Sequence, residues 1–238
     1  MIKAILFDKD GTLLEYTEGW VDSIVDFLEE KTIDEGKKKK LFKEIGIRED
    51  GGVEENSILS SETAMDLAII FSKYLDEDLG KIYREIDDHL LNYLKENNNF
   101  IRETCDLKSL FETLKSKGIL IGIFTSDNYR QAKYSMEYLN IDSFIDFYAA
   151  ADIYEKKPNR ESLEVFKDKY SLKDQEIIIV GDSRVDMVFG EDTVKIGVLC
   201  GTGSREMLGA YTDNIINDPS EILEFPQAYK KIIKILEI

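Results

Sequence analysis

Acidic, hydroxyl and basic side chains that could carry out chemistry lie in four short stretches of this 238-residue sequence. The stretches are FDKDGTL at 7–13, TSD at 125–127, KKP at 156–158 and GDSRVD at 181–186. The first stretch closes an apolar run with Asp8 and Asp10, although a carboxylate at the end of a buried strand costs free energy unless it is paired. A metal ion, a lysine or a substrate must therefore pair with these two side chains.

The two aspartates of the first stretch could divide the work of phosphoryl transfer between them. Asp8 could attack phosphorus and form an aspartyl-phosphate, which is a known form of covalent catalysis. Asp10, two residues further on, could protonate the leaving oxygen and then activate water. Gly11 would let the backbone turn tightly beside the substrate, and Thr12 is grouped with it as a substrate-binding residue. We therefore predict Asp8 and Asp10 as catalytic residues.

The other stretches supply partners for these carboxylates and for a phosphate group. Thr125 or Ser126 could donate hydrogen bonds to phosphate oxygens. Lys157 would neutralise the nucleophile and the transferring group, and it is the third predicted catalytic residue. Phosphate monoesters hydrolyse very slowly unaided, so a site needs both positioning and charge compensation. These residues together supply both.

Aspartates from two stretches could also hold a metal ion. Asp182 and Asp8 offer carboxylate oxygens, which suit a hard cation such as Mg²⁺, and that cation would screen the repulsion between carboxylate and phosphate. A calcium loop beginning at Asp8 is excluded, because its sixth and twelfth positions would be Leu13 and Gly19 instead of glycine and glutamate. Mg²⁺ is therefore the predicted cofactor.

Apolar runs that alternate with helical patterns would position these stretches. The runs are short, nearly continuous and mostly rich in β-branched residues, and they lie at 2–7, 119–124, 144–150, 177–180 and 194–199. Such runs are typical of strands in a parallel sheet that is covered on both faces. We predict an α/β fold with a doubly wound, Rossmann-like parallel sheet, in which ligands bind beyond the carboxyl ends of the strands.

Residues 16–99 differ from the rest of the chain, because they contain helical stripes of apolar residues and no convincing strand. A connection between a strand and a helix is normally short, so this length requires an inserted domain. We expect a helical cap domain at 16–99 and a core domain made of 1–15 and 100–238.

Composition limits the partners of the protein. The chain has 31 basic and 48 acidic side chains and a formal net charge of −17. This balance argues against binding to nucleic acid or to an anionic membrane, which would need a basic face. No secretory signal is visible, and Cys105 and Cys200 lie far apart, as in a protein with reduced thiols. We expect a cytoplasmic monomer or homodimer that acts on a small molecule.

Taken together, the four stretches resemble the four motifs of the haloacid dehalogenase-like (HAD) hydrolases, in that family's order. FDKDGTL, Thr125, the Lys157-Pro158 pair and GDSRVD carry the resemblance, which covers about residues 1–15 and 100–220. A helical insert directly after the first motif resembles the type 1 cap of phosphoglycolate-phosphatase-like members.

This resemblance implies a Mg²⁺-dependent phosphatase with an aspartyl nucleophile at Asp8. It also implies that the backbone carbonyl of Asp10 joins Asp8 and Asp182 on the metal. Asp186 would lie at the metal or next to it.

Asp10 indicates the branch of the family. The dehalogenases resemble this chain but lack the second aspartate, because a halide leaving group needs no proton. We therefore expect a phosphatase for a small phosphorylated metabolite: phosphoglycolate, a sugar phosphate, a nucleotide or pyrophosphate. A phosphomutase of the β-phosphoglucomutase type and a catalytically silent HAD-like interaction module remain as alternatives.

Four further features are candidates for contact with substrate or phosphate, and three of them admit a simpler interpretation. Arg48, Trp20 and the segment 57–61 are candidates for substrate contact, but Trp20 is also typical of a cap core and Arg48 of a solvated surface. CGTGS at 200–204 lacks the Gly-Lys-Ser/Thr ending of a phosphate loop, so a plain turn before a helix is favoured.

Overall fold

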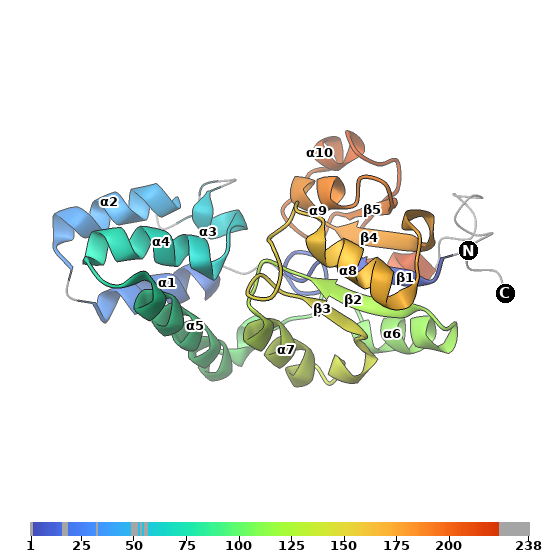
Figure 1. Ribbon diagram of the computed structural model, residues 1–238, viewed down its shortest axis with the longest axis horizontal. Helices are drawn as coiled ribbons and strands as arrows, with labels where there is room; N and C mark the ends of the chain where they lie inside the picture. The colour runs from blue at the N-terminus through green and yellow to red at the C-terminus, as the bar shows by residue number, and fades with distance from the viewer. Residues whose placement is uncertain are drawn as a thin grey trace. The chain divides into compact units, whose positions relative to one another are not determined.

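The computed structural model describes residues 2–15, 19–31, 33–48, 52, 54 and 57–223. The chain divides into two compact units (Figure 1). The first comprises Met1–Tyr16, Ile101–Thr125 and Ala132–Ile238, and the second comprises Thr17–Phe100 and Ser126–Gln131. The last part of the expected core domain, 224–238, lies outside the described residues.

The first unit is built on a parallel sheet. Its strands are β1 (Ala4–Phe7), β2 (Leu120–Phe124), β3 (Phe147–Ala149), β4 (Ile177–Gly181), β5 (Val194–Val198) and β6 (Ile215–Ile216). They lie in the order β3-β2-β1-β4-β5-β6. The chain runs from β1 outward to β3 and then returns to β4, so the strand order reverses between β1 and β4. The predicted doubly wound α/β fold is confirmed.

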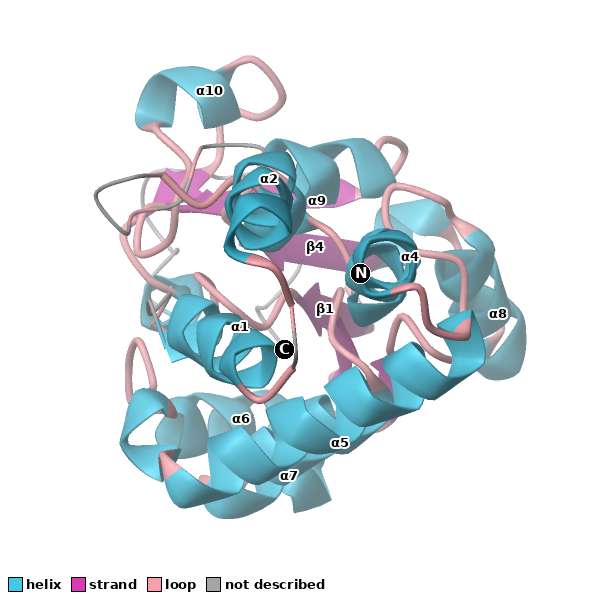
Figure 2. Cartoon of the chain, turned by 90° about the vertical axis from the view of Figure 1, so that its left-hand side faces the viewer, coloured by secondary structure: helices cyan, strands magenta, loops and turns pink. Residues whose placement is uncertain are grey.

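The two central strands of the sheet, β1 and β4, lie side by side and are drawn in magenta in Figure 2. Ile5 pairs with Ile178, and Phe7 pairs with Val180. Every residue of both strands is buried, which explains why they are apolar on both faces.

Helices follow the strands along the chain. They are α6 (Leu107–Ser116), α7 (Tyr129–Tyr138), α8 (Glu161–Tyr170), α9 (Arg184–Phe189) and α10 (Arg205–Gly209), with short 3₁₀ helices η2 (Asp142–Phe144), η3 (Asp174–Glu176) and η4 (Pro219–Leu223). Helix α6 begins where the side chain of Asp106 accepts a hydrogen bond from the backbone of Ser109. The chain turns away after it at Gly118, which has a φ of 73°.

Successive residues of β1 face different helices. Leu6 belongs to a buried cluster that includes Phe166 of α8 and Phe189 of α9. The ring of Phe7 instead lies 5.6 Å from the ring of Phe111 on α6. Helices therefore cover both faces of the sheet at the strand that carries the first motif.

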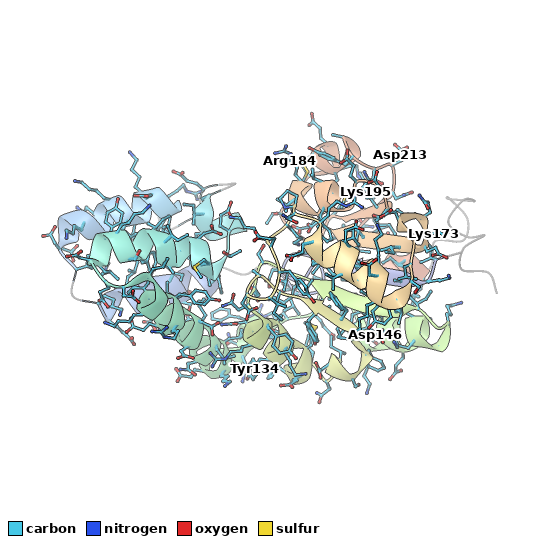
Figure 3. All side chains as sticks on the ribbon, in the orientation of Figure 1. Tyr134, Asp146, Lys173, Arg184, Lys195 and Asp213 are labelled. Atoms are coloured by element: carbon cyan, nitrogen blue, oxygen red, sulfur yellow. The ribbon has the colours of Figure 1, made fainter. Side chains whose placement is uncertain are left out.

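The strands differ from the predicted runs in two places. The run 144–150 predicts one strand, but β3 begins only at Phe147. The carboxylate of Asp146, labelled in Figure 3, accepts the backbone N–H of Ile121 at 2.7 Å, so a side chain takes a donor that a strand carbonyl could use. Strand β6 is not predicted, because two residues are too few to reveal a period.

The second unit is helical. Its elements are α1 (Gly19–Glu29), α2 (Glu35–Ile45), α3 (Ile58–Ser61), α4 (Ala64–Leu75), α5 (Leu79–Glu96) and η1 (Asn98–Phe100). Its core includes Ile24, Phe71 and Ile86, and Trp20 packs against that core, as the simpler interpretation of Trp20 predicts. None of the helices in the described part of the chain has the length and apolar character needed to cross a membrane.

Candidate active site

The first and fourth motifs meet where the strand order reverses. Asp8 directly follows β1, and its backbone N–H donates to the carbonyl of Val180 on β4 at 2.9 Å. Asp182 directly follows Gly181, the last residue of β4. In a doubly wound sheet the crevice for a ligand lies at this reversal, beyond the carboxyl ends of the strands.

Three carboxylates gather at this point. Asp8, Asp182 and Asp186 each offer one oxygen, and these three oxygens lie within 4.8 Å of one another. Asp182 is 3% exposed and Asp186 is 1% exposed, so water screens their charges weakly. Such a group needs a positive partner.

Lys157 supplies that partner from the loop between β3 and α8. Its Nζ lies 2.6 Å from Oδ1 of Asp8 and 2.6 Å from Oδ1 of Asp186. The lysine side chain is only 9% exposed. The structure therefore brings together four residues predicted from sequence, whereas the neighbouring Lys156 is exposed.

Burial and mutual repulsion act on two of the carboxylates. Burial is the main cause that raises the pKa of Asp8 well above its usual value; the charge of Lys157 opposes this, and the charges of Asp186 and Asp182 add to it. Burial and the charge of Asp186 raise the pKa of Asp182 to about 6, against hydrogen bonds from Thr202. Both groups therefore accept a proton more readily than an exposed aspartate.

The same neighbours also act on the pKa of Lys157. Burial is the largest single influence on the pKa of Lys157 and lowers it, but the charges and hydrogen bonds of Asp186 and Asp8 together raise the pKa above its ordinary value. Lys157 therefore keeps its positive charge at neutral pH.

Asp186 is held by the first turn of α9. Its Oδ2 accepts hydrogen bonds from the backbone N–H of Ser183 at 3.1 Å and from the Ser183 hydroxyl at 2.6 Å. The Ser183 hydroxyl also accepts the backbone N–H of Asp186, so the two residues form a capping box. One carboxylate oxygen thus fixes the helix, while the other binds Lys157.

Asp10 has a different environment. Its Oδ1 lies 2.7 Å from Nζ of Lys9, and its side chain is 43% exposed while that of Lys9 is 6% exposed. Sequence reasoning missed Lys9, because a lysine between two aspartates carries no signal about the direction of its side chain. The structure gives the predicted proton carrier a buried cation as its neighbour.

The turn after Asp10 is tight. Gly11 has a φ of 79°, and a Cβ added there would lie 2.7 Å from Oδ2 of Asp182, so only glycine fits. The side chain of Thr12 is fully buried, and its carbonyl accepts the hydroxyl of Thr104 at 2.7 Å. Substrate binding by Gly11 and Thr12 stays a prediction.

The remaining predicted contacts fall in both units. Thr125 is buried at the end of β2, where its N–H donates to the carbonyl of Ala149 at 3.0 Å. Ser126 and Arg48 belong to the second unit, in which the backbone N–H of Arg48 donates to the carbonyl of Gly52 at 2.7 Å. Their contacts with substrate also stay predictions.

A further contact comes from the stretch CGTGS. The backbone N–H of Thr202 lies 2.6 Å from Oδ2 of Asp182, and the Thr202 hydroxyl lies 2.9 Å from the same oxygen. The sequence predicts a plain turn before a helix at this stretch, and α10 does begin after it. The two glycines were the only signal of a close backbone approach.

Comparisons with known proteins agree with this geometry. Residues 5–194 match the model of a family described as haloacid dehalogenase-like hydrolase. A PpaX protein of Clostridium perfringens is 28% identical over 94% of this chain and 97% of its own. The phosphoglycolate phosphatase of Vibrio parahaemolyticus is 25% identical over 94% of this chain and 95% of its own.

A solved structure shows the same fold. The β-phosphoglucomutase of Clostridium difficile matches with a TM-score of 0.65 and 19% identity, over 98% of this chain and 96% of that one. The resemblance predicted from the four motifs is thus confirmed by the family model, the relatives and the sheet. The chain belongs to the haloacid dehalogenase-like hydrolase family.

Proposed function

We propose that this hydrolase is a Mg²⁺-dependent phosphatase, which releases phosphate from a small phosphorylated metabolite through an aspartyl-phosphate. One observation carries the proposal: Lys157 bridges Asp8 and Asp186, with Asp182 in the same cluster. A nucleophile, a cation beside it and a group of oxygen ligands are the parts that phosphoryl transfer requires.

The donor set fits a hard divalent cation. Carboxylate oxygens are the ligands that Mg²⁺ prefers, and three of them lie within 4.8 Å of one another. Three carboxylates against one ammonium leave a formal charge of −2, which one divalent cation would neutralise. Asp8 and Asp182 would hold the ion, with the backbone carbonyl of Asp10 and with Asp186 beside them. When bound, Mg²⁺ would stabilise the negative charge that develops on the phosphoryl oxygens.

The protein groups then divide the reaction between them. An oxygen of Asp8 forms a bond to phosphorus while the bond from phosphorus to the ester oxygen breaks, and Asp10 gives that leaving oxygen its proton. In the second step Asp10 takes a proton from water, whose oxygen attacks phosphorus and displaces the Asp8 carboxylate. Lys157 offsets negative charge at the nucleophile throughout.

The names of relatives narrow the substrates to be tested. The Bacillus mycoides relative is named pyrophosphatase PpaX, and the Vibrio parahaemolyticus relative is named phosphoglycolate phosphatase. Pyrophosphate and phosphoglycolate therefore head the list, before sugar phosphates and nucleotides. The presence of Asp10 favours phosphate esters over carbon–halogen cleavage, because a halide leaving group needs no proton.

The proposal also covers the role of the second unit and the location of the protein in the cell. We assign that helical unit the role of a substrate-selecting cap, with Arg48 and Ser126 as candidate contacts. The two free cysteines support a cytoplasmic location.

A phosphate-release assay tests the proposal. The purified protein is given pyrophosphate, phosphoglycolate, sugar phosphates and nucleotides, with Mg²⁺ and with EDTA. We expect release only with Mg²⁺, and we expect Asp8→Asn to abolish it while the circular dichroism spectrum is kept. Asp168→Asn, at an exposed aspartate of α8, is the matched control. Release that survives Asp8→Asn refutes the nucleophile, and a folded protein inactive on every substrate favours the interaction module.

A further inference from the structure

The loop that follows β5 closes on a carboxylate of the acidic cluster. Thr202 donates two hydrogen bonds to Oδ2 of Asp182, from its backbone N–H at 2.6 Å and from its hydroxyl at 2.9 Å. Hydrogen bonds to an ionised oxygen are stronger than bonds between neutral groups. The carboxylate of Asp182, which follows β4, is thus fixed by the loop that follows β5.

Glycine permits this approach. A Cβ added at Gly201 would lie 2.2 Å from Oδ2 of Asp182 and 2.4 Å from the carbonyl oxygen of Gly11. The backbone next to Thr202 therefore lies directly against both the carboxylate and the turn of the first motif. Any other residue at 201 would push the loop away from Asp182.

The contacts separate the two oxygens of Asp182. Among the described residues, the hydrogen bonds that this carboxylate accepts fall on Oδ2. Asp186 follows the same rule, since its Oδ2 binds Ser183 and its Oδ1 binds Lys157. In each case one oxygen is fixed by a hydroxyl and a backbone N–H, and these bonds leave the other oxygen for a different partner, which for Asp186 is Lys157.

We propose that Thr202 is a positioning residue, which fixes Oδ2 of Asp182 so that Oδ1 serves as the ligand for the divalent cation. This inference rests on the proposed function, because it assumes that the acidic cluster binds such a cation. Partners that orient a metal ligand typically change metal affinity 10–100-fold when they are removed. Thr202 itself does not touch the metal or the reacting atoms in this proposal.

The test measures binding of Mn²⁺ alone, without substrate, from the electron paramagnetic resonance signal of the free ion. Thr202→Val keeps the backbone N–H and the branched shape but lacks the hydroxyl, so we expect the dissociation constant to rise about tenfold. Thr202→Ser keeps the hydroxyl and should stay within about twofold of the natural protein. A parallel assay should find a higher Mg²⁺ requirement for activity, with an unchanged KM for substrate at saturating Mg²⁺.

Thr212→Val is the matched control. The Thr212 hydroxyl donates to the carbonyl of Lys195, labelled in Figure 3, at 2.9 Å, so this variant loses a similar bond in the same unit without touching Asp182. We expect it to bind Mn²⁺ as the natural protein does. If Thr202→Val fails to fold, Thr202→Ala removes the same hydroxyl and is judged by the same measurement.

Two failures are distinguishable. A folded Thr202→Val protein that binds Mn²⁺ with natural affinity overturns the role of Thr202 and leaves the proposed function standing. A natural protein that binds no Mn²⁺ overturns the metal site of the proposed function, and this inference with it.

Discussion

Replacing Lys157 with methionine tests the electrostatic account of the site without any substrate. The side chain of Lys157 is buried and its Nζ lies 2.6 Å from carboxylate oxygens of both Asp8 and Asp186. Methionine fills a similar volume but carries no charge. The variant therefore leaves three clustered carboxylates without their shared cation.

The expected loss follows from burial. Removing one partner of a buried ion pair costs about 3–5 kcal/mol, because the remaining charge has neither a partner nor water. The Asp186 side chain is only 2% exposed, so solvent cannot replace the ammonium. We expect the free energy of unfolding of Lys157→Met to fall by about 3–5 kcal/mol at pH 8 in EDTA. Saturating Mg²⁺ should restore part of this loss, since it supplies positive charge to the same oxygens.

Urea unfolding followed by circular dichroism measures the change. Lys156→Met is the control, since that lysine is exposed and surface substitutions usually stay within about 0.5 kcal/mol. A loss below about 1 kcal/mol for Lys157→Met in EDTA would refute the account of three carboxylates balanced on one lysine. An equal effect of Mg²⁺ on the variant and the natural protein would count against it too.

Three further predictions concern single residues. Asp10→Asn should slow hydrolysis about 10²–10⁴-fold for alkyl phosphates and far less for p-nitrophenyl phosphate, whose leaving group needs no proton; equal losses in phosphate release would contradict acid catalysis. Gly201→Ala should lower the free energy of unfolding by about 1–3 kcal/mol in urea titrations, because its Cβ would lie 2.2 Å from Oδ2 of Asp182. Gly209→Ala, whose Cβ would meet only a methyl group 4.0 Å away, should be nearly neutral. Burial raises the pKa of Cys105 from 9.0 to about 11, so the thiolate fraction at pH 8 falls about 100-fold. Iodoacetamide should therefore label Cys105 far more slowly in the folded than in the unfolded protein, by mass spectrometry, with a rate that rises between pH 9 and 11.

The gathering of Asp8, Lys157 and Asp182 could be predicted from sequence because it depends on a simple geometric fact. Parallel strands place their carboxyl ends at one edge of a sheet, so polar residues that follow such strands become neighbours. The residue types then indicate the chemistry. The same reasoning cannot give distances, because the bridge that Lys157 makes between two carboxylates depends on the path of the loop between β3 and α8.

The contacts of Lys9 and Thr202 could not be predicted, for a different reason. Lys9 lies between two aspartates of its own loop, and only the backbone turn decides that its Nζ meets Asp10. The shorter bond of Thr202 to Asp182 comes from a backbone N–H, which every residue except proline possesses. Residue type therefore carries little information about this contact, and the flanking glycines suggest only that some close approach occurs.

The charge of the whole chain and the charge of the site lead to different conclusions about anionic partners. A formal net charge of −17 disfavours binding to the extended phosphate backbone of nucleic acid, which needs many surface cations. A single phosphoryl group depends instead on the charges within a few ångströms of it. Three carboxylates against one ammonium would repel that group, and in the proposed function a divalent cation between them offsets this repulsion. An acidic chain can therefore act on a phosphate ester, because in the proposed function the divalent cation offsets the charge of the cluster that the phosphoryl group meets.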